Sequence, residues 1–236
     1  MARAPSGDAI DIVVPVFGAA AELDRCLASV RRHTDPRRSR LLAVLDGPQT
    51  PEVEGVIAGH LAASPLETEV VRRAARAGFA ASVNAGIERG DRDVVLLNSD
   101  TEVTAAWLDK LAEAAASATD IASVTPFSNS ATICSLPRWL EENALPAGFS
   151  LDAFSRLVEE CAVPARPELP TGVGFCLYLR RAALREVGAL DAGRFGLGYG
   201  EEVEWCLRAS RLGWRHVLDD ATFVYQDRKS VVWERV

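Results

Sequence analysis

The 236-residue sequence lacks a basic excess and any long apolar run, and each absence excludes a class of protein. Its net charge of −7 argues against the basic stripe that contacts phosphates in nucleic-acid-binding proteins, so we expect no nucleic-acid partner. No apolar run approaches the roughly 20 residues of a membrane-spanning helix. Residues 1–8 lack the basic-then-apolar order of a secretory signal, so we expect a cytoplasmic protein.

Paired cysteines and lysine-rich segments are missing too. The five cysteines are widely spaced and form no CxxC pair, so we expect free, buried thiols and no zinc site. His33, His60 and His216 stand where structural histidines are common. The basic residues are nearly all arginine, and one group follows the first expected helix. This group is interpreted as a solvated helix end, with contact to the inner face of an anionic membrane as the alternative. It comprises Arg31, Arg32, Arg37, Arg38 and Arg40.

What the first half contains is an alternation of apolar, β-branched runs with segments of helical spacing. Such an alternation is typical of βαβ units and predicts an α/β fold with a mainly parallel sheet flanked by helices. The expected strands are 10–17, 41–45, 67–71 and 93–97, and the expected helices are 19–33, 52–63, 80–89 and 104–116.

The second half is less regular. Residues 126–170 are rich in proline, serine and asparagine, which predicts a long excursion over the sheet with one helix. A glycine-bearing loop then runs into an apolar strand. The expected elements are a helix over 151–161, a loop and strand over 171–179, helices over 181–187 and 201–212, and a final strand over 221–225.

Polar residues follow two of the expected strands, where parallel sheets bind their ligands. Asn98 and Asp100 stand two residues apart and can point the same way, as a half-site for a hard cation that also takes phosphate oxygens. A turn or helix cap is the alternative interpretation. Asp46 suits the hydrogen-bonding edge of a nucleobase, or equally a turn before Gly47.

Three acids open the expected helix over 201–212. Acidic residues stabilise helix N-termini, and Glu204 can pair with Arg208 one turn later, so a structural role is one interpretation. The crowding of Glu201, Glu202 and Glu204 also raises the pKa of at least one of them, as a general base requires. The preceding glycines Gly196, Gly198 and Gly200 allow close approach of a ligand.

Taken together, these segments resemble the inverting family 2 of GT-A-fold glycosyltransferases, in particular a rhamnosyltransferase-like subgroup. The resemblance runs over about residues 8–226. Each motif is weak alone, but their order and spacing follow the family. The motifs are IDIVVPVFGAAAELDRCLASV (10–30), Asp46-Gly47, GFAASVNAGI (78–87), LLNSDTEV (96–103) and GYGEEVEWCLRASRLGW (198–214).

The resemblance implies a nucleotide-sugar-binding half over 8–125 and an acceptor-binding half over 126–226 of one domain. It implies transfer of a sugar from a nucleoside-diphosphate donor to a saccharide or lipid-linked acceptor, with Mn²⁺ or Mg²⁺ as cofactor. The usual setting of the family is cell-surface polysaccharide or glycolipid synthesis.

The resemblance also assigns roles to residues. Asp100 is the main metal ligand, with Asn98 beside it and residue 226 as a further ligand. Glu202 is the general base, and Glu201 is the reserve candidate. Residues assigned to the nucleotide sugar are Pro15, Val16, Phe17, Asp46, Gly78, Asn84, Asn98, Thr171 and Gly172.

Three departures from the family pattern bear on activity. Asn98 replaces an acid, Glu202 and Glu204 replace the commoner Asp, and Gln226 replaces a metal-binding His. Residues 227–236 do not resemble family sequence; they resemble a translated adapter sequence. If foreign bases begin inside codon 226, the natural residue is His, because codons starting with CA encode only His or Gln.

Three other functions fit parts of the pattern. A haloacid-dehalogenase-like phosphatase needs two acids where Asn98 and Asp100 stand. A sugar nucleotidyltransferase needs a basic, glycine-rich loop where Gly18 is followed by alanines. A non-catalytic module that binds nucleotide is the interpretation if Gln226 is genuine or the chain is a fragment. The oligomeric state is left open.

Overall fold

The computed structural model describes residues 9–195 and 200–227 of the chain. The strands are β1 (Ile10–Val16), β2 (Ser39–Leu45), β3 (Glu67–Arg72), β4 (Asp93–Leu97), β5 (Thr101–Glu102), β6 (Ile121–Phe127), β7 (Glu168–Leu169), β8 (Cys176–Leu179), β9 (Arg215–Phe223) and β10 (Tyr225–Gln226). The helices are α1 (Ala20–His33), α2 (Pro51–Ala63), α3 (Phe79–Ile87), α4 (Trp107–Ala116), α5 (Leu151–Cys161), α6 (Arg181–Val187), α7 (Ala192–Phe195) and α8 (Glu201–Arg211), with a short 3-10 helix at Thr132–Cys134.

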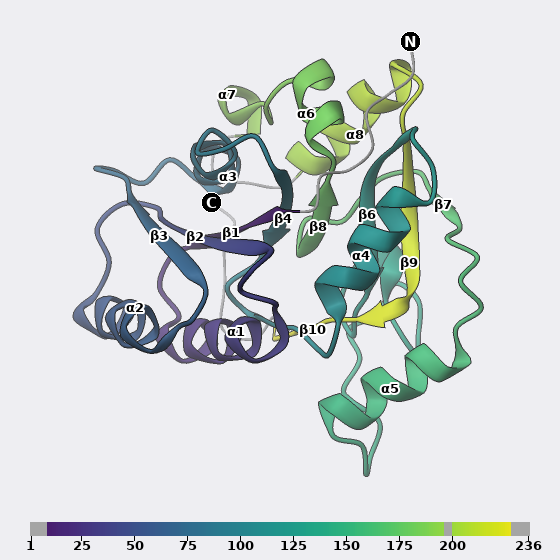
Figure 1. Ribbon diagram of the computed structural model, residues 1–236, viewed down its shortest axis with the longest axis horizontal. Helices are drawn as coiled ribbons and strands as arrows, with labels where there is room; N and C mark the ends of the chain where they lie inside the picture. Colours follow the sequence, from purple (N-terminus) through teal and green to yellow (C-terminus); the bar gives the residue numbers. More distant parts are fainter. Residues whose placement is uncertain (1–8, 196–199, 228–236) are drawn as a thin grey trace.

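An eight-stranded sheet in the order β3-β2-β1-β4-β8-β6-β9-β7 forms the centre of the molecule (Figure 1). The pairs among β1, β2, β3 and β4 are parallel, as is the pair of β6 with β9. Strand β8 is antiparallel to both β4 and β6, and so joins the two parallel parts. A separate ribbon pairs β5 with β10. The mainly parallel α/β sheet predicted from the sequence is therefore confirmed.

Helices cover both faces of the sheet because successive strand residues point to opposite sides. On β1, Ile12 and Val14 belong to a buried cluster that includes residues of α1, α2 and α4, whereas Val13 belongs to a second cluster with residues of α3, α6 and α8. Figure 1 shows α1 and α2 on one side of the sheet and α3, α6 and α8 on the other. Three layers result, and they leave the strand ends to carry polar groups.

Helix starts follow the local sequence where a cap is available. The hydroxyl of Thr50 accepts a hydrogen bond from the Val53 amide, and Pro51 occupies the first turn of α2. Ser150 caps α5 in the same way through the Ala153 amide. Each cap satisfies a backbone donor that the helix itself leaves without a partner.

The second half differs in detail from the sequence prediction. Strand β6 was not predicted, and the excursion expected from residue 126 begins only after it. The final strand, expected over 221–225, begins already at Arg215. The reason is Asp219, which interrupts the apolar pattern but is buried and accepts hydrogen bonds from the Thr222 hydroxyl and the Ala221 amide.

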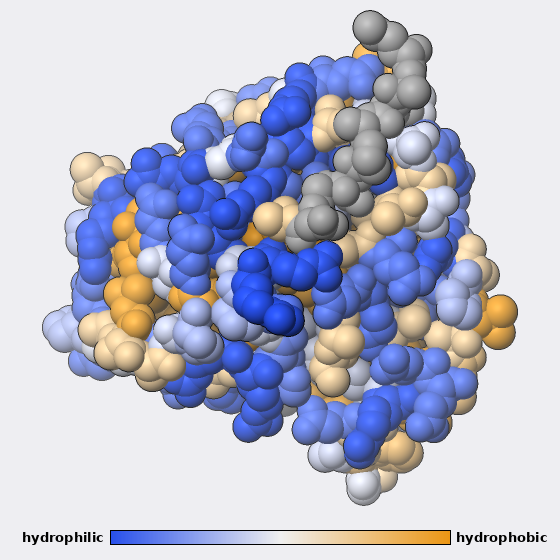
Figure 2. Space-filling view, in the orientation of Figure 1, coloured by the Kyte–Doolittle hydropathy of each residue, from blue (hydrophilic) through white to orange (hydrophobic). Residues whose placement is uncertain are grey.

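The surface seen in Figure 2 is mainly hydrophilic, with hydrophobic residues in separate groups. In the arginine group, Arg40 forms two hydrogen bonds of 2.8 and 3.1 Å with the buried Asp11, and Arg37 binds its neighbour Asp35. Part of this group is therefore structural. Of the five free thiols, Cys161 is exposed, which corrects the expectation that all are buried. Within 9–195 and 200–227, no helix has the length and apolarity to cross a membrane.

Candidate active site

Asp46, directly after β2, holds the segment that precedes α3. Its side chain is fully buried, and its two carboxylate oxygens accept hydrogen bonds of 2.9 Å from the amides of Ala77 and Gly78. The guanidinium of Arg73 lies 3.6 Å from the same carboxylate. Gly47 has a φ of +82°, and a Cβ there would lie 2.8 Å from the Arg76 backbone nitrogen. Asp46 and Gly47 thus bring residues 73–78 against the end of β2.

Phe17 directly follows β1, whose last residue pairs with the last residue of β2. Pro15 and Val16 are buried within the strand, whereas Phe17 is partly exposed, and the Arg76 guanidinium lies 3.7 Å from the centre of its ring. The side chain of Gln49 accepts a hydrogen bond from the Gly18 amide. A cation stacked on an aromatic ring at a strand end offers a flat, positively charged surface.

Asn84, which the sequence assigns to the nucleotide pocket, connects α3 to a distant turn. Its side-chain amide donates to the Leu190 carbonyl at 2.7 Å and accepts from the Leu190 amide at 3.0 Å. In the structure this side chain therefore anchors Leu190, two residues before α7, to α3. Its contact with nucleotide stays a prediction.

Asp100, directly before β5, and Gln226, in β10, meet at the end of the ribbon that these two strands form. The Asp100 side chain is buried, and the Gln226 Nε2 lies 3.4 and 3.5 Å from its two oxygens. The Gln226 Oε1 is buried and has no hydrogen-bond partner in the described part of the chain. A buried acceptor without a donor is costly. Turning the Gln226 amide by 180° would exchange its two atoms, so that Oε1 would face Asp100 and could share a cation with it. The donor set of carboxylate and amide oxygens suits Mn²⁺ or Mg²⁺.

Asn98 directly follows β4, two residues before Asp100. Its side chain is partly exposed and makes no hydrogen bond within the described residues, while its backbone carbonyl accepts from the Thr101 hydroxyl at 2.7 Å. Among the described residues, no group of three or more Asp, Glu, His or Cys side chains is placed to hold a metal ion. The residues that the sequence assigns to the cation are one carboxylate and two amides, a weakly charged set, and their joint role stays a prediction.

The acids at the start of α8 differ strongly in environment. Glu201 is 3% exposed, its Oε2 has no partner among the described residues, and burial, reinforced by the charge of Glu202, raises its pKa to about 7. The raised pKa expected for this cluster is thus found at Glu201, and burial, more than repulsion, causes it. Glu202 is partly exposed. Glu204 binds Arg208 at 2.7 Å, as predicted, while Gly196 and Gly198 lie outside the described residues.

Residues 171–175 connect the strand end at Asn98 with the acids of α8. The Phe175 carbonyl accepts a hydrogen bond of 2.8 Å from the Asn98 amide. One residue earlier, Gly174 lies under Glu202, because a Cβ at this glycine would be 3.6 Å from the Glu202 carboxylate. Asn98 and Glu202 therefore border the same two-residue stretch of backbone.

The first residues of this segment contact α8 and β8. The Gly172 amide donates to the Cys206 sulfur at 3.2 Å, and a side chain on Gly172 would collide with Leu177. Thr171 is half-buried, and its hydroxyl binds the Gly172 carbonyl. The segment is thus fixed in place between α8 and the sheet.

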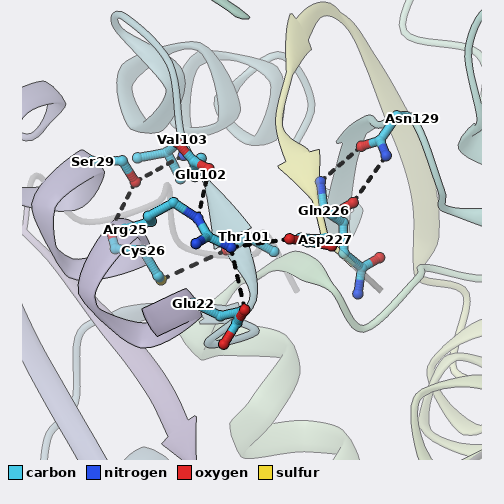
Figure 3. A network of polar contacts seen from close by, with 10 residues as sticks. All are labelled: Glu22, Arg25, Cys26, Ser29, Thr101, Glu102, Val103, Asn129, Gln226 and Asp227. Carbon is cyan, nitrogen blue, oxygen red and sulfur yellow. Dashed lines mark hydrogen bonds and ion pairs between the residues drawn. The ribbon is translucent and has the colours of Figure 1, made fainter. Parts of the chain in front are cut away.

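Sequence reasoning missed two residues around the ribbon, Arg25 and Asn129 (Figure 3). Arg25 lies on α1. Its guanidinium is 3.0 Å from Asp227, the residue after β10, and 3.3 Å from Glu102 in β5. Asn129 binds the backbone of Gln226 with both atoms of its amide. No periodicity or motif marks these contacts, because 202 and 97 residues separate Arg25 from Asp227 and Asn129 from Gln226.

Comparison with known proteins identifies the family and the fold. The family model described as "Glycosyl transferase family 2" matches residues 11–188. No curated protein matches the chain.

Solved structures share the fold at low sequence identity. A structure of GalNAc-T7 with UDP, GalNAc and Mn²⁺ has a TM-score of 0.72 at 14% identity, covering 92% of this chain and 43% of that one. The mannosyltransferase PcManGT from Pyrobaculum calidifontis, in complex with GDP-Man and Mn²⁺, has a TM-score of 0.67 at 15% identity, covering 97% and 61%. Residues 1–349 of TarS from S. aureus give 0.63 at 14% identity, covering 92% and 60%. The chain thus spans about half of the length of these structures.

Proposed function

The chain belongs to glycosyl transferase family 2, and from this membership we propose that it moves a sugar from a nucleoside-diphosphate donor to an acceptor hydroxyl, with inversion. The observation that carries the proposal is the shared border of Gly174 and Phe175, where the strand end at Asn98 meets Glu202. In transfer with inversion, the incoming hydroxyl bonds to the sugar carbon on one face while the bond to the diphosphate breaks on the other, and the base takes the hydroxyl proton. Asn98 and Glu202, on the two sides of Gly174 and Phe175, support this assignment of the two sides.

On the donor side, Asp100 with the side-chain oxygens of Asn98 and Gln226 would hold a divalent cation. When bound, such a cation neutralises the negative charge that develops on the departing diphosphate. The unpartnered Oε1 of Gln226 supports this assignment. The similar structures with UDP and Mn²⁺, and with GDP-Man and Mn²⁺, support the class of donor.

The remaining donor contacts are proposed at the C-terminal ends of β1 and β2, beside the start of α3. Phe17, stacked under Arg76, suits a flat nucleobase, and the turn ordered by Asp46 borders it. Other residues assigned to the nucleotide sugar are Pro15, Val16, Gly78, Asn84, Asn98, Thr171 and Gly172.

On the acceptor side, Glu202 is proposed as the general base. It is partly exposed and can reach an incoming hydroxyl, whereas Glu201 is buried and its pKa of about 7 keeps much of it protonated near neutral pH. Glu201 therefore remains the reserve candidate. Residues 8–125 would bind the nucleotide sugar, and residues 126–226 the saccharide or lipid-linked acceptor.

The biological setting is proposed by analogy with the family. We place the protein in the cytoplasm or at the inner face of the membrane, where it would take part in the synthesis of cell-surface polysaccharide or glycolipid. We assign it to a rhamnosyltransferase-like subgroup.

We also propose that the natural residue at position 226 is His. Re-sequencing the locus tests this, since a continuous reading frame through Val236 in independent reads would refute it.

A thermal-shift screen tests the donor site. UDP, GDP, dTDP and CDP are each added with and without Mn²⁺, because a ligand that binds only the native state raises the melting temperature. We expect one diphosphate to stabilise the protein only with Mn²⁺. Asp100→Asn should abolish that shift, and Asp91→Asn, which changes an exposed carboxylate, should keep it.

The results separate the candidate functions. If all four diphosphates are inert, the donor-site assignment fails. If one binds with metal but its sugar nucleotide is never turned over, the protein is a nucleotide-binding module. Release of pyrophosphate from a nucleoside triphosphate plus sugar phosphate would instead favour a nucleotidyltransferase.

A further inference from the structure

The segment that follows β6 reaches across to the strand that carries residue 226. Asn129, at its start, is 3% exposed. Its Oδ1 accepts a hydrogen bond of 2.7 Å from the Gln226 amide, and its Nδ2 donates one of 2.9 Å to the Gln226 carbonyl (Figure 3). One side-chain amide thus pairs with a backbone residue as a neighbouring strand would.

Asn129 provides the hydrogen bonds to the Gln226 backbone that strand β5 does not provide. Gln226 lies opposite Thr101, and the hydrogen bond beside this pair runs from the Asp227 amide to the Asp100 carbonyl at 2.9 Å. Strand β5 therefore holds the residue that follows Gln226, while the polar backbone groups of Gln226 itself go to Asn129. Since β10 has only two residues, Asn129 fixes the backbone from which the Gln226 side chain projects toward Asp100.

Asn129 is itself held by its own segment. Its backbone carbonyl accepts from the backbone amide and the side chain of Asn143, at 2.9 and 3.1 Å. Its Oδ1 also accepts from the Ser128 hydroxyl at 3.2 Å. Asn129, Asn143 and Gln226 are all buried, so little water competes for these bonds. Turning the Asn129 amide over would set a donor against the Gln226 amide and an acceptor against the Gln226 carbonyl.

We propose that Asn129 is a positioning residue for the divalent cation of the transfer site. It acts through the backbone of residue 226 and keeps that side chain directed at Asp100. The inference rests on the proposed function, because it assumes that Asp100 and residue 226 share the cation. Supporting groups of this kind commonly change metal affinity about 10- to 100-fold when they are removed.

Mn²⁺ affinity, measured without turnover, tests the inference. Free Mn²⁺ is followed by its electron paramagnetic resonance signal as the ion is titrated into protein saturated with the diphosphate that stabilises the wild type. Asn129→Ala removes both bonds to residue 226. Asn129→Asp keeps the size of the side chain but faces the Gln226 carbonyl with an acceptor.

A matched control changes the same segment without touching residue 226. Ser135→Ala removes the buried hydrogen bond of 2.9 Å that the Ala131 amide donates to the Ser135 hydroxyl. If Asn129 only stabilises its segment, all three variants should lose melting temperature and keep wild-type Mn²⁺ affinity.

The expected result is a dissociation constant for Mn²⁺ about tenfold higher in both Asn129 variants and unchanged in Ser135→Ala. Unchanged Mn²⁺ affinity in the Asn129 variants overturns the positioning role while the proposed function stands. A wild type that binds no Mn²⁺ with any of the four diphosphates overturns the proposed function, and the positioning role with it.

Discussion

The side-chain amide of Gln226 lies 3.4 Å from one carboxylate oxygen of Asp100 and 3.5 Å from the other, although 126 residues separate the two. This pair brings a residue that follows the last strand of the main sheet beside the motif that follows β4. It also leaves the Gln226 Oε1 buried without a partner in the described part of the chain. An amide at this position is a weaker and harder metal ligand than an imidazole.

The first prediction concerns the metal preference set by residue 226. Gln226→His places a softer nitrogen ligand opposite Asp100, so we expect the ratio of Co²⁺ to Mg²⁺ affinity to rise about tenfold. Metal titrations in the presence of the bound diphosphate measure it. Gln226→Leu, which removes the ligand without adding one, should weaken both metals, and an unaltered ratio in Gln226→His would remove residue 226 from the cation site.

The second prediction follows from the buried carboxyl of Glu201. Burial, with a lesser effect of the Glu202 charge, raises its pKa from 4.5 to about 7. The folded protein therefore keeps this proton to a higher pH than the unfolded chain does. Stability should fall as the pH rises from about 4.5 to above 7, by at most about 3 kcal/mol from this group.

Denaturant titrations at pH 5 and pH 8 check this dependence. Glu201→Gln removes the titrating group, so the wild type should lose more stability between the two pH values than the variant does. An equal loss in both proteins would mean that Glu201 ionises in the folded state as it does in the unfolded chain.

Much of this arrangement is predictable from the sequence, and the reasons are local. The β-branched run of β1, the spacing of α1 and the polar residues after β4 each carry their signal within a few positions. They place Asp100 at a strand end without any knowledge of the rest of the chain. The acids of α8 are found in the same way, next to a glycine-bearing loop.

Other features are invisible in the sequence because their partners are distant. Asp46 matches a nucleobase-binding position by pattern, yet its carboxylate is bound by the Ala77 and Gly78 amides, which only the folded chain brings near. Asn129 carries no signal in a segment of many polar residues. The start of β9 was missed because a buried Asp219 looks like a loop residue.

The third prediction tests this structural role of Asp46. Asp46→Asn turns one of its two acceptors into a donor that faces a backbone amide, so a buried amide loses its partner. We expect a loss of about 1–3 kcal/mol in the free energy of unfolding. Chemical denaturation measures it, with Asp91→Asn as the exposed control; a variant as stable as the wild type would show that these two bonds contribute nothing.

The fourth prediction concerns Arg25, which joins α1 to both strands of the ribbon. Its guanidinium is partly exposed, so its ion pairs with Glu102 and Asp227 are screened by solvent and contribute little each. We expect Arg25→Gln to cost less than about 1 kcal/mol at low salt and nothing measurable in 1 M NaCl. Denaturation curves at the two salt concentrations decide it, since a loss that persists in high salt would assign Arg25 a packing role.

The most direct measurement compares binding and turnover in the same samples of Glu202→Gln. The diphosphate identified by thermal shift reports binding, and its release from the matching sugar nucleotide reports turnover, with Glu204→Gln as the control on the same helix. We predict that Glu202→Gln keeps metal-dependent binding and loses at least about 100-fold in turnover, while Glu204→Gln keeps both. Unchanged turnover in Glu202→Gln would contradict the account and move the base to Glu201.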